Sequence, residues 1–242
     1  MLELQHVSYT VKDENNNDKQ ILKDISVTIN DRFVAVTGPN GGGKSTLAKI
    51  IAGIYTPTSG KIILDGEDIT NLSITERAQK GISFAFQQPV RFKGITVKDL
   101  ICLAAGKNLK INEACEYLSE VGLCARDYIN REVNASLSGG ELKRIEIAMI
   151  IARGTKFSVF DEPEAGIDLW SFNNLIQVFE SMHKKINGTI LIISHQERIL
   201  DIADKILVVA DGRIADFGHK KDILPALLGG KQIACKTLID KF

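Results

Sequence analysis

Short apolar runs alternate along the chain with longer stretches that have helical spacing. Four continuous apolar runs have the length expected of buried strands: residues 32–38, 81–89, 156–162 and 189–195. Helical patterns separate them, as in residues 169–185 between the last two runs. Strands that alternate with helices predict a mainly parallel central sheet, so we expect an α/β fold.

Two other regions show patterns typical of antiparallel strands. Residues 2–7 and 25–30 alternate between apolar and polar positions, as half-buried strands do. The segment 12–19 between them is wholly polar and predicts a surface hairpin loop. Residues 205–218 predict a second hairpin, with its turn at Asp211–Gly212. We therefore expect an antiparallel β subdomain beside the central sheet.

The region from about residue 90 to residue 134 has a mostly helical pattern. Its clearest piece, residues 112–122, has Asn112 as a candidate N-cap and Gly122 as a candidate stop. We interpret the region as a helical subdomain inserted between core strands. We expect one domain over residues 1–242, in which residues 1–86 and 154–242 form an α/β core with its β subdomain. Residues 87–153 form a helical subdomain that includes the segment Ser138–Glu141.

The composition is that of a globular protein with a sizeable core. The 242 residues are 44% hydrophobic and 25% charged, and the formal net charge is +0. Nucleic-acid binders usually have a basic excess, so we expect no nucleic acid partner. No apolar run approaches the roughly 18 residues that a membrane span needs, and residues 1–20 lack the features of a signal peptide. We therefore expect a cytoplasmic protein.

The cysteines do not form a metal-binding pattern. None belongs to a C-x-x-C pair, and we expect four reduced packing residues in a reducing compartment: Cys102, Cys115, Cys124 and Cys235. A metal or iron–sulfur site made by this chain alone is not expected. A site shared with another subunit or with a partner stays open.

A phosphate-binding pattern, G-x-x-x-x-G-K-[ST], lies between a predicted strand and a predicted helix. Its nine residues are the expected set that binds the phosphates of a nucleotide: Gly38, Pro39, Asn40, Gly41, Gly42, Gly43, Lys44, Ser45 and Thr46. The glycines let backbone N–H groups point at phosphate oxygens, and the helix N-terminus favours an anion. Lys44 would reach the β- and γ-phosphates, and Ser45 would bind Mg²⁺. The alternative, a flexible glycine turn, does not explain the flanking strand and helix.

Polar side chains follow the other predicted buried strands. Asp161 and Glu162 end one strand, where in phosphate-loop enzymes an Asp holds Mg²⁺ and an adjacent Glu can polarise the attacking water. His195 could donate a hydrogen bond to the γ-phosphate, and the amide of Gln87 could bind Mg²⁺ or orient a water. Ligands bind at the carboxyl ends of parallel strands, so we expect these side chains near the loop. Taken singly, each is also compatible with an ordinary polar strand end.

A second candidate anion site lies at Ser138, Gly139, Gly140 and Glu141. The pattern S-x-x-E predicts a capping box that starts a helix, which is the purely structural explanation. That explanation does not account for two consecutive glycines, each of which weakens a helix by about 1 kcal/mol relative to alanine. A hydroxyl and N–H groups at the positive end of a buried helix suit an anion, although the lysine of a phosphate loop is absent.

Together the motifs resemble those of the ATP-binding cassette (ABC) ATPases along nearly the whole chain. GPNGGGKST is similar to their Walker A loop, LSGGE to the family signature, FSVFDEP to Walker B, AGID to the D-loop and ISH to the switch histidine, all in the family's order. The resemblance implies a P-loop NTPase fold of the RecA-like type. It also implies an enzyme that hydrolyses ATP to ADP and phosphate.

The resemblance further implies a dimer. In this family two cassettes pack head to tail around two ATP molecules, and each signature contacts the γ-phosphate held by the other cassette. The resemblance implies that Glu162 is the general base, His195 the γ-phosphate sensor and Lys44 the phosphate-binding lysine. It implies that Ser45, Gln87 and Asp161 lie around Mg²⁺. It also implies that Asp168 is a dimer contact. The aromatic residue on which the family usually stacks adenine is replaced here by Val11.

Two segments narrow the resemblance. GISFAFQQPVRFKGITV is similar to the Gln-loop region of SufC, the ATPase of SUF iron–sulfur cluster assembly, and SHQERILD is similar to its His-loop. This implies a SufB-type scaffold as partner, bound through the helical subdomain and the Gln-loop. The alternative is the ATPase subunit of a membrane transporter, whose coupling helices would dock on the same surface. A DNA-repair or translation ATPase is disfavoured, because those usually carry long insertions or two cassettes.

Overall fold

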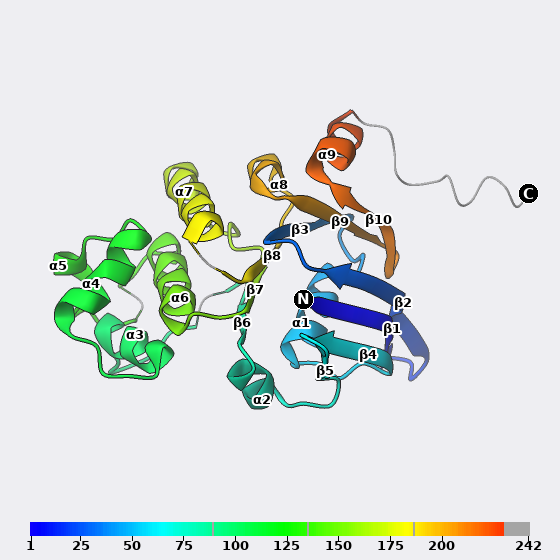
Figure 1. The fold of residues 1–242 in the computed structure, drawn as a ribbon, viewed down its shortest axis with the longest axis horizontal. Helices are drawn as coiled ribbons and strands as arrows, with labels where there is room; N and C mark the ends of the chain where they lie inside the picture. The colour runs from blue at the N-terminus through cyan, green and yellow to red at the C-terminus, as the bar shows by residue number, and fades with distance from the viewer. Residues whose placement is uncertain (89, 135, 186, 230–242) are drawn as a thin grey trace, which may run out of the picture. The chain divides into compact units, whose positions relative to one another are not determined.

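A computed structural model describes most of the chain, namely residues 1–88, 90–134, 136–185 and 187–229. The chain divides into two compact units, the first made of Met1–Ile74 with the chain from Ile193 onward and the second of Thr75–Ile192. Within the described segments, no helix is both long enough and apolar enough to cross a membrane. Figure 1 shows the elements of both units with the labels used below.

The first unit contains two sets of strands. Its described elements are β1 (Leu2–Lys12), β2 (Asp18–Ile29), β3 (Phe33–Thr37), α1 (Lys44–Ala52), β4 (Ser59–Leu64), β5 (Glu67–Asp68), α8 (Glu197–Ile202), β9 (Lys205–Ala210), β10 (Arg213–His219) and α9 (Lys220–Leu228). Strands β2, β1, β4 and β5 form an antiparallel sheet in that order (Figure 1). Strand β9 pairs antiparallel with β10 and parallel with β3. The expected antiparallel β subdomain and the expected second hairpin are both present.

The first hairpin is longer than the sequence pattern predicts. The predicted strand 2–7 continues to Lys12, and the polar segment 12–19 supplies strand residues at both ends, which leaves 13–17 as the turn. Register shifts interrupt the pairing of β1 from Leu4 onward. Such bulges break the strict alternation of side chains between the two faces, so a period-two pattern stops where they begin.

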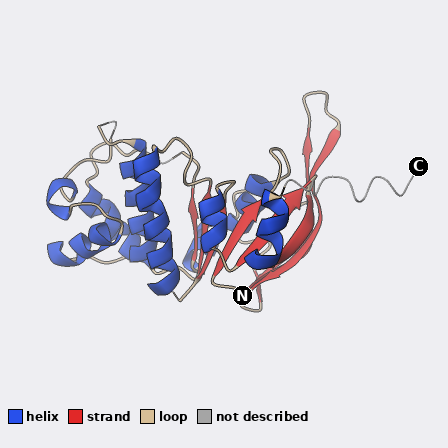
Figure 2. Cartoon of the chain, turned by 90° about the horizontal axis from the view of Figure 1, so that it is seen from above, coloured by secondary structure: helices blue, strands red, loops and turns tan. Residues whose placement is uncertain are grey.

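The second unit combines three strands with a cluster of helices. Its described elements are α2 (Ile74–Gln79), β6 (Ile82–Ala85), α3 (Val97–Ala105), α4 (Ile111–Glu120), α5 (Ala125–Tyr128), α6 (Gly139–Arg153), β7 (Phe157–Asp161), α7 (Leu169–Lys185) and β8 (Thr189–Ile193). Strands β8, β7 and β6 follow one another in that order, and β6 and β7 are parallel. Helices α3 and α4 both contact α6, and Figure 2 shows the helices in blue and the strands in red.

The predicted buried strands are confirmed. Every residue of β3, β7 and β8 is buried, and β6 has one half-buried residue. These four strands coincide with the four apolar runs of the sequence. Their carboxyl ends therefore carry the residues that the sequence pattern singled out, and the fold is the expected α/β arrangement.

The predicted N-cap of the helix at 112–122 is wrong. Helix α4 begins at Ile111, two residues earlier than a cap at Asn112 implies, and its N-cap is Lys110. The Glu113 carboxylate accepts a hydrogen bond from the Lys110 N–H at 2.8 Å. This is the part of a capping box in which the carboxylate at the third helical position accepts from the N–H of the N-cap residue. The stop is correct, because Gly122 follows the helix with a left-handed φ of 68°.

Candidate functional site

The phosphate loop connects β3 to α1 and requires glycine at several positions. Gly38 and Gly43 have φ values of 133° and 103°, which other residues rarely adopt. A Cβ atom on Gly38 would lie 2.1 Å from the backbone oxygen of Val209, and one on Gly43 would lie 2.7 Å from a methyl group of Leu22. The tight loop is therefore fixed by the strands beside it, as a preformed binding site requires.

The outer side of the loop is open. Gly41 also has a left-handed φ, 77°, but a Cβ atom there would meet no heavy atom within 4 Å. Lys44 is buried and donates hydrogen bonds from Nζ to the backbone oxygens of Gly38 and Pro39, at 2.8 and 2.9 Å. Its ammonium group thus lies against the loop, at the helix end where the backbone dipole favours an anion.

His195 lies in the same unit as the phosphate loop. The N–H of Ser194 donates a hydrogen bond to the backbone oxygen of Val36 at 3.0 Å, so the chain after β8 continues beside the end of β3. The buried Ser194 hydroxyl accepts a bond from the Gln196 N–H at 3.0 Å, which fixes the backbone on both sides of His195. The His195 side chain is exposed. His195 therefore follows a buried strand, as the sequence pattern predicts, and its role at the γ-phosphate stays a prediction.

In the second unit, the structure brings Gln87 and Glu162 together. Gln87 follows β6, Glu162 follows β7, and the Gln87 amide donates a hydrogen bond from Nε2 to Glu162 Oε2 at 2.8 Å. The adjacent Asp161 is buried at the end of β7. Glu162 has a left-handed φ of 45°, a conformation that costs about 1–3 kcal/mol outside glycine and is found mainly where the surrounding structure enforces it.

Two charged residues on α6 were missed by the sequence interpretation. Lys143 donates a hydrogen bond from Nζ to the backbone oxygen of Phe86, and the Phe86 N–H donates one to Glu146 Oε1 at 3.2 Å. Lys143 also pairs with Glu146 Oε2 at 3.2 Å. The available signal was a lysine and a glutamate three residues apart in a helix that is otherwise largely buried. That spacing alone is too common on helices to indicate a site.

The start of α6 has the predicted capping box. The Ser138 side chain accepts from the Glu141 N–H at 3.3 Å, and Glu141 Oε2 accepts from the Ser138 N–H at 2.7 Å. The Tyr128 hydroxyl donates a third bond to the Glu141 carboxylate, and this bond raises the pKa of Tyr128. Burial opposes ionisation of Glu141, but the bonds from Tyr128 and Ser138 outweigh it and hold its pKa below the ordinary value. The helix therefore starts at a rigid point.

The two glycines of this helix start differ in their surroundings. A Cβ atom on Gly140 would lie 3.1 Å from both Cβ and Oγ of Ser171, which is tighter than an ordinary contact. A Cβ atom on Gly139 would lie 3.7 Å from the backbone oxygen of Gly166, an ordinary van der Waals contact. Packing thus explains Gly140 but leaves Gly139 without a structural requirement.

The segment that contains Asp168 packs beside the helix start. Asp168 Oδ1 accepts hydrogen bonds from the N–H groups of Trp170 and Ser171, both at 3.0 Å, and these bonds begin α7. The bond from Ser171 is the main reason why the pKa of Asp168 is lowered. Because Ser171 is also the neighbour of Gly140, the structure brings the signature and the Asp168 turn together.

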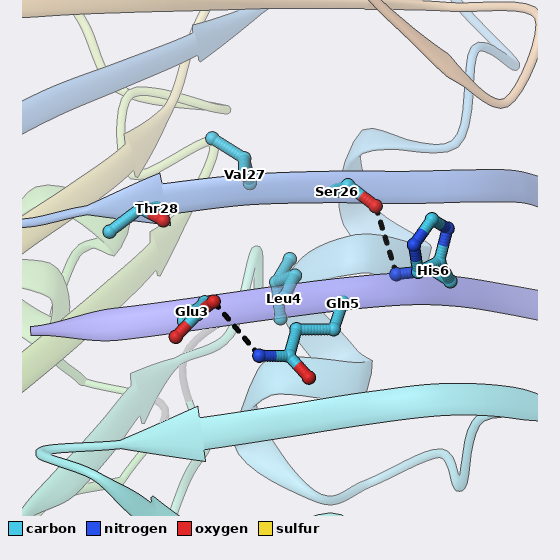
Figure 3. Close-up of a pocket in the computed structure, with 7 residues that line it drawn as sticks. All are labelled: Glu3, Leu4, Gln5, His6, Ser26, Val27 and Thr28. Atoms are coloured by element: carbon cyan, nitrogen blue, oxygen red, sulfur yellow. Dashed lines mark hydrogen bonds between the residues drawn. The ribbon is translucent and has the colours of Figure 1, made fainter.

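A hollow of about 550 Å³ on β1 and β2 lies apart from the predicted site residues (Figure 3). Gln5 donates a hydrogen bond to Glu3, and the His6 N–H donates one to Ser26, each at 2.9 Å. His6 also pairs with Asp24 at 2.7 Å. Several polar groups of the hollow are thus bonded to protein groups, and we do not identify this hollow with the nucleotide site.

Comparison with known proteins assigns the class. Residues 22–165 match the family model described as ABC transporter. Over 215 residues the chain is 39% identical to the uncharacterized ABC transporter ATP-binding protein MJ0035 of Methanocaldococcus jannaschii, a match that covers 85% of this chain and 86% of that protein. It is 30% identical over 213 residues to the lipopolysaccharide export system ATP-binding protein LptB of Haemophilus influenzae, with 85% and 87% covered.

The fold comparison agrees with this class. The dimeric post-hydrolysis structure of the ATP-binding cassette MJ0796, bound to ADP and Pi, superposes with a TM-score of 0.80 at 24% identity, covering 91% of this chain and 99% of that one. The chain belongs to the ABC transporter family, and it is an ATP-binding cassette with ATPase activity.

The different surroundings of the two glycines predict different effects of alanine. Gly139→Ala should leave the unfolding temperature unchanged or raise it, because alanine favours a helix by about 1 kcal/mol and finds room there. Gly140→Ala should lower it, because the added methyl group crowds Ser171 and overpacking costs about 1–3 kcal/mol. Thermal unfolding and ATP turnover are measured for both variants. Full turnover by a stable Gly139→Ala variant would show that anion binding does not require a glycine at this position.

Proposed function

We propose that two copies of this chain bind and hydrolyse ATP at shared sites, and that the cycle of association and release drives a conformational change in a partner. The observation that carries this proposal is the start of α6. Its side chains are already engaged in the capping box, its dipole favours an anion, and Gly139 is a glycine that packing does not require. An anion site without a lysine of its own suits a nucleotide held by another subunit.

Within each copy, the phosphate loop would hold the nucleotide. Its glycine backbone and the N-terminus of α1 would bind the phosphate oxygens, and Lys44 would move from the Gly38 and Pro39 oxygens to the β- and γ-phosphates. His195 would donate a hydrogen bond to the γ-phosphate. Adenine would be held without the aromatic stacking residue usual in the family, because Val11 lies at the matching position in β1. The nearby Tyr9 stacks on Tyr55, with ring centroids 5.3 Å apart.

The residues expected around Mg²⁺ have suitable chemistry. Ser45 supplies a hydroxyl, Gln87 an amide oxygen and Asp161 a buried carboxylate, and hard oxygen groups of this kind are the ligands that Mg²⁺ prefers. The ion would neutralise charge on the phosphates. Asp161 would be the anionic member of the set. Gln87 would connect the ion to Glu162, to which its amide bonds.

Glu162 is proposed as the general base. Its carboxylate would take a proton from water while the water oxygen bonds to the γ-phosphorus and the bond from that phosphorus to the ADP oxygen breaks. The strained backbone at φ 45° fixes where the side chain leaves β7. The Gln87 amide donates to one carboxylate oxygen at 2.8 Å, and this bond orients the side chain that would accept the proton.

The partner is proposed to be a soluble scaffold of the SufB type. Support comes from the resemblance of the Gln-loop and His-loop sequences to those of SufC. Further support comes from two apolar side chains beside Gln87: Phe86 is 43% exposed and Val90 is 50% exposed. Both side chains are exposed enough to be available to a partner protein. Cys102, Cys115 and Cys124 lie in or beside separate helices, so a cluster would be held mainly by the partner; Cys235 lies outside the described residues.

The second candidate is the ATPase subunit of a membrane transporter. It is favoured by the names of the relatives, which include an ABC transporter ATP-binding protein and an export system ATP-binding protein. The exposed side chains beside Gln87 would serve a membrane subunit equally well. The two candidates therefore share the ATPase cycle and differ in the partner.

The shared-site proposal predicts that Glu162→Gln traps a dimer. ATP should still bind, turnover should fall by at least about 100-fold because the base is lost, and light scattering should show twice the monomer mass with ATP. Trp170 is the chain's single tryptophan, is 80% exposed and adjoins Asp168, so its fluorescence should shift to shorter wavelength when the dimer forms. Glu180→Gln, the same substitution at an exposed position of α7, is the control and should behave as wild type.

The partner proposal predicts the fraction in which the native complex is found. With a SufB-type partner, the chain should stay in the supernatant after ultracentrifugation and co-purify with a protein that carries iron and acid-labile sulfide. Val90→Asp should abolish co-purification without changing basal ATPase activity, whereas Ile74→Asp, at a similarly exposed apolar position at the start of α2, should retain it. Co-purification with a membrane-spanning subunit would instead establish the transporter role.

A further inference from the structure

A single ion pair on the signature helix holds both backbone polar groups of Phe86. Lys143 bonds to the Phe86 carbonyl oxygen, Glu146 accepts from the Phe86 N–H at 3.2 Å, and the two side chains bond to each other at 3.2 Å. Phe86 is the first residue after β6, so the strand pairing that satisfies β6 ends at Ala85. Side chains of α6 therefore satisfy the backbone groups of the first residue beyond the strand.

This pair is costly to bury. Lys143 is only 2% exposed, and burial is the main cause of a raised pKa at Glu146, which the charge of Lys143 partly offsets. Apolar residues in place of a buried ion pair are often neutral or stabilising. Stability alone is therefore a weak reason for a lysine and a glutamate at these positions, and a purely structural role would be served by simpler side chains.

The position of the pair points to Gln87. The Phe86 carbonyl belongs to the peptide bond that joins Phe86 to Gln87, so the bond from Lys143 fixes the plane of that peptide. The Gln87 side chain is attached to the Cα atom that follows this peptide, and its amide Nε2 lies 2.8 Å from Glu162 Oε2. A misplacement of about 1 Å at a catalytic group can cost about 100-fold in rate.

We infer that Lys143 and Glu146 are positioning residues that hold Gln87 against the catalytic carboxylate of Glu162 through the backbone of Phe86. The inference rests on the roles proposed above for Gln87 and Glu162. Lys143 lies five residues after Ser138 on the same helix, about 7 Å along its axis. The pair therefore connects the helix that carries the signature to the group that activates water.

The decisive experiment is a double-mutant cycle between Lys143 and Gln87, read as kcat and KM for ATP. Lys143→Met should lower kcat about tenfold or more and leave KM nearly unchanged, because the phosphate loop is untouched. Gln87→Ala should lower kcat as well. When both changes are combined, kcat should fall no further than with Gln87→Ala alone, since Lys143 acts through Gln87.

A control on the same helix separates positioning from general damage. Arg153 also lies on α6 and also donates to a backbone oxygen of the second unit, that of Ala78, at 2.9 Å. Arg153→Met should keep kcat within about twofold of wild type, and its small effect should add to that of Gln87→Ala, as expected for independent sites.

An apolar replacement of the whole pair separates positioning from stability. The variant Lys143→Met with Glu146→Leu removes both charges together, so no buried charge is left without a partner, and it should unfold at or above the wild-type temperature. Its kcat should nevertheless fall about tenfold or more, as with Lys143→Met.

The outcomes distinguish the failure of this inference from the failure of the proposed function. Wild-type kcat in the folded apolar variant, or effects of Lys143→Met and Gln87→Ala that add fully, would overturn the positioning role while Glu162→Gln remains inactive. Full turnover by Glu162→Gln would overturn the proposed catalytic base itself. A loss of kcat that disappears in the Gln87→Ala background, together with a stable apolar variant, supports the inference.

Discussion

The arrangement of the second unit depends on how rigidly helix α6 begins. The bonds among Ser138, Glu141 and Tyr128 fix the first turn, and Gly140 allows the helix to lie directly against Ser171 at the start of α7. Once that point is set, the rise of the helix determines where its later side chains lie. Lys143 and Glu146 then reach the end of β6, and the signature, the Asp168 turn and the Gln87–Glu162 pair are held by one element.

Most of the fold was predictable because its signals are local. Continuous apolar runs identified β3, β6, β7 and β8, and the residues that follow them identified the phosphate loop, Gln87, Asp161, Glu162 and His195. The capping box at Ser138 was predicted from four letters because its two hydrogen bonds join residues that are three positions apart. The family and its ATPase activity followed from the order of these motifs.

The missed features depend on contacts between distant parts of the sequence. The hydrogen bond between Lys143 and Phe86 joins residues 57 positions apart, and no local sequence pattern at either residue predicts it. The separate requirements of Gly139 and Gly140 depend on Ser171 and Gly166, which pattern alone does not place beside the helix start. The extent of β1 was underestimated because bulges interrupt its alternation. The cap of α4 was misplaced because the helix starts at a lysine whose N–H bonds to Glu113 in the first turn, and a lysine is not a typical cap residue.

The left-handed backbone of Glu162 has a consequence for how this sequence would change under selection for robustness alone. Glycine adopts that conformation without strain, so a screen that rewards only folding should enrich glycine at this position. The same screen would discard the carboxylate. A variant selected for thermal stability alone is therefore expected to keep the cassette fold and to bind ATP but not to hydrolyse it. Such a variant would stay in its ATP-bound assembly instead of being released from it.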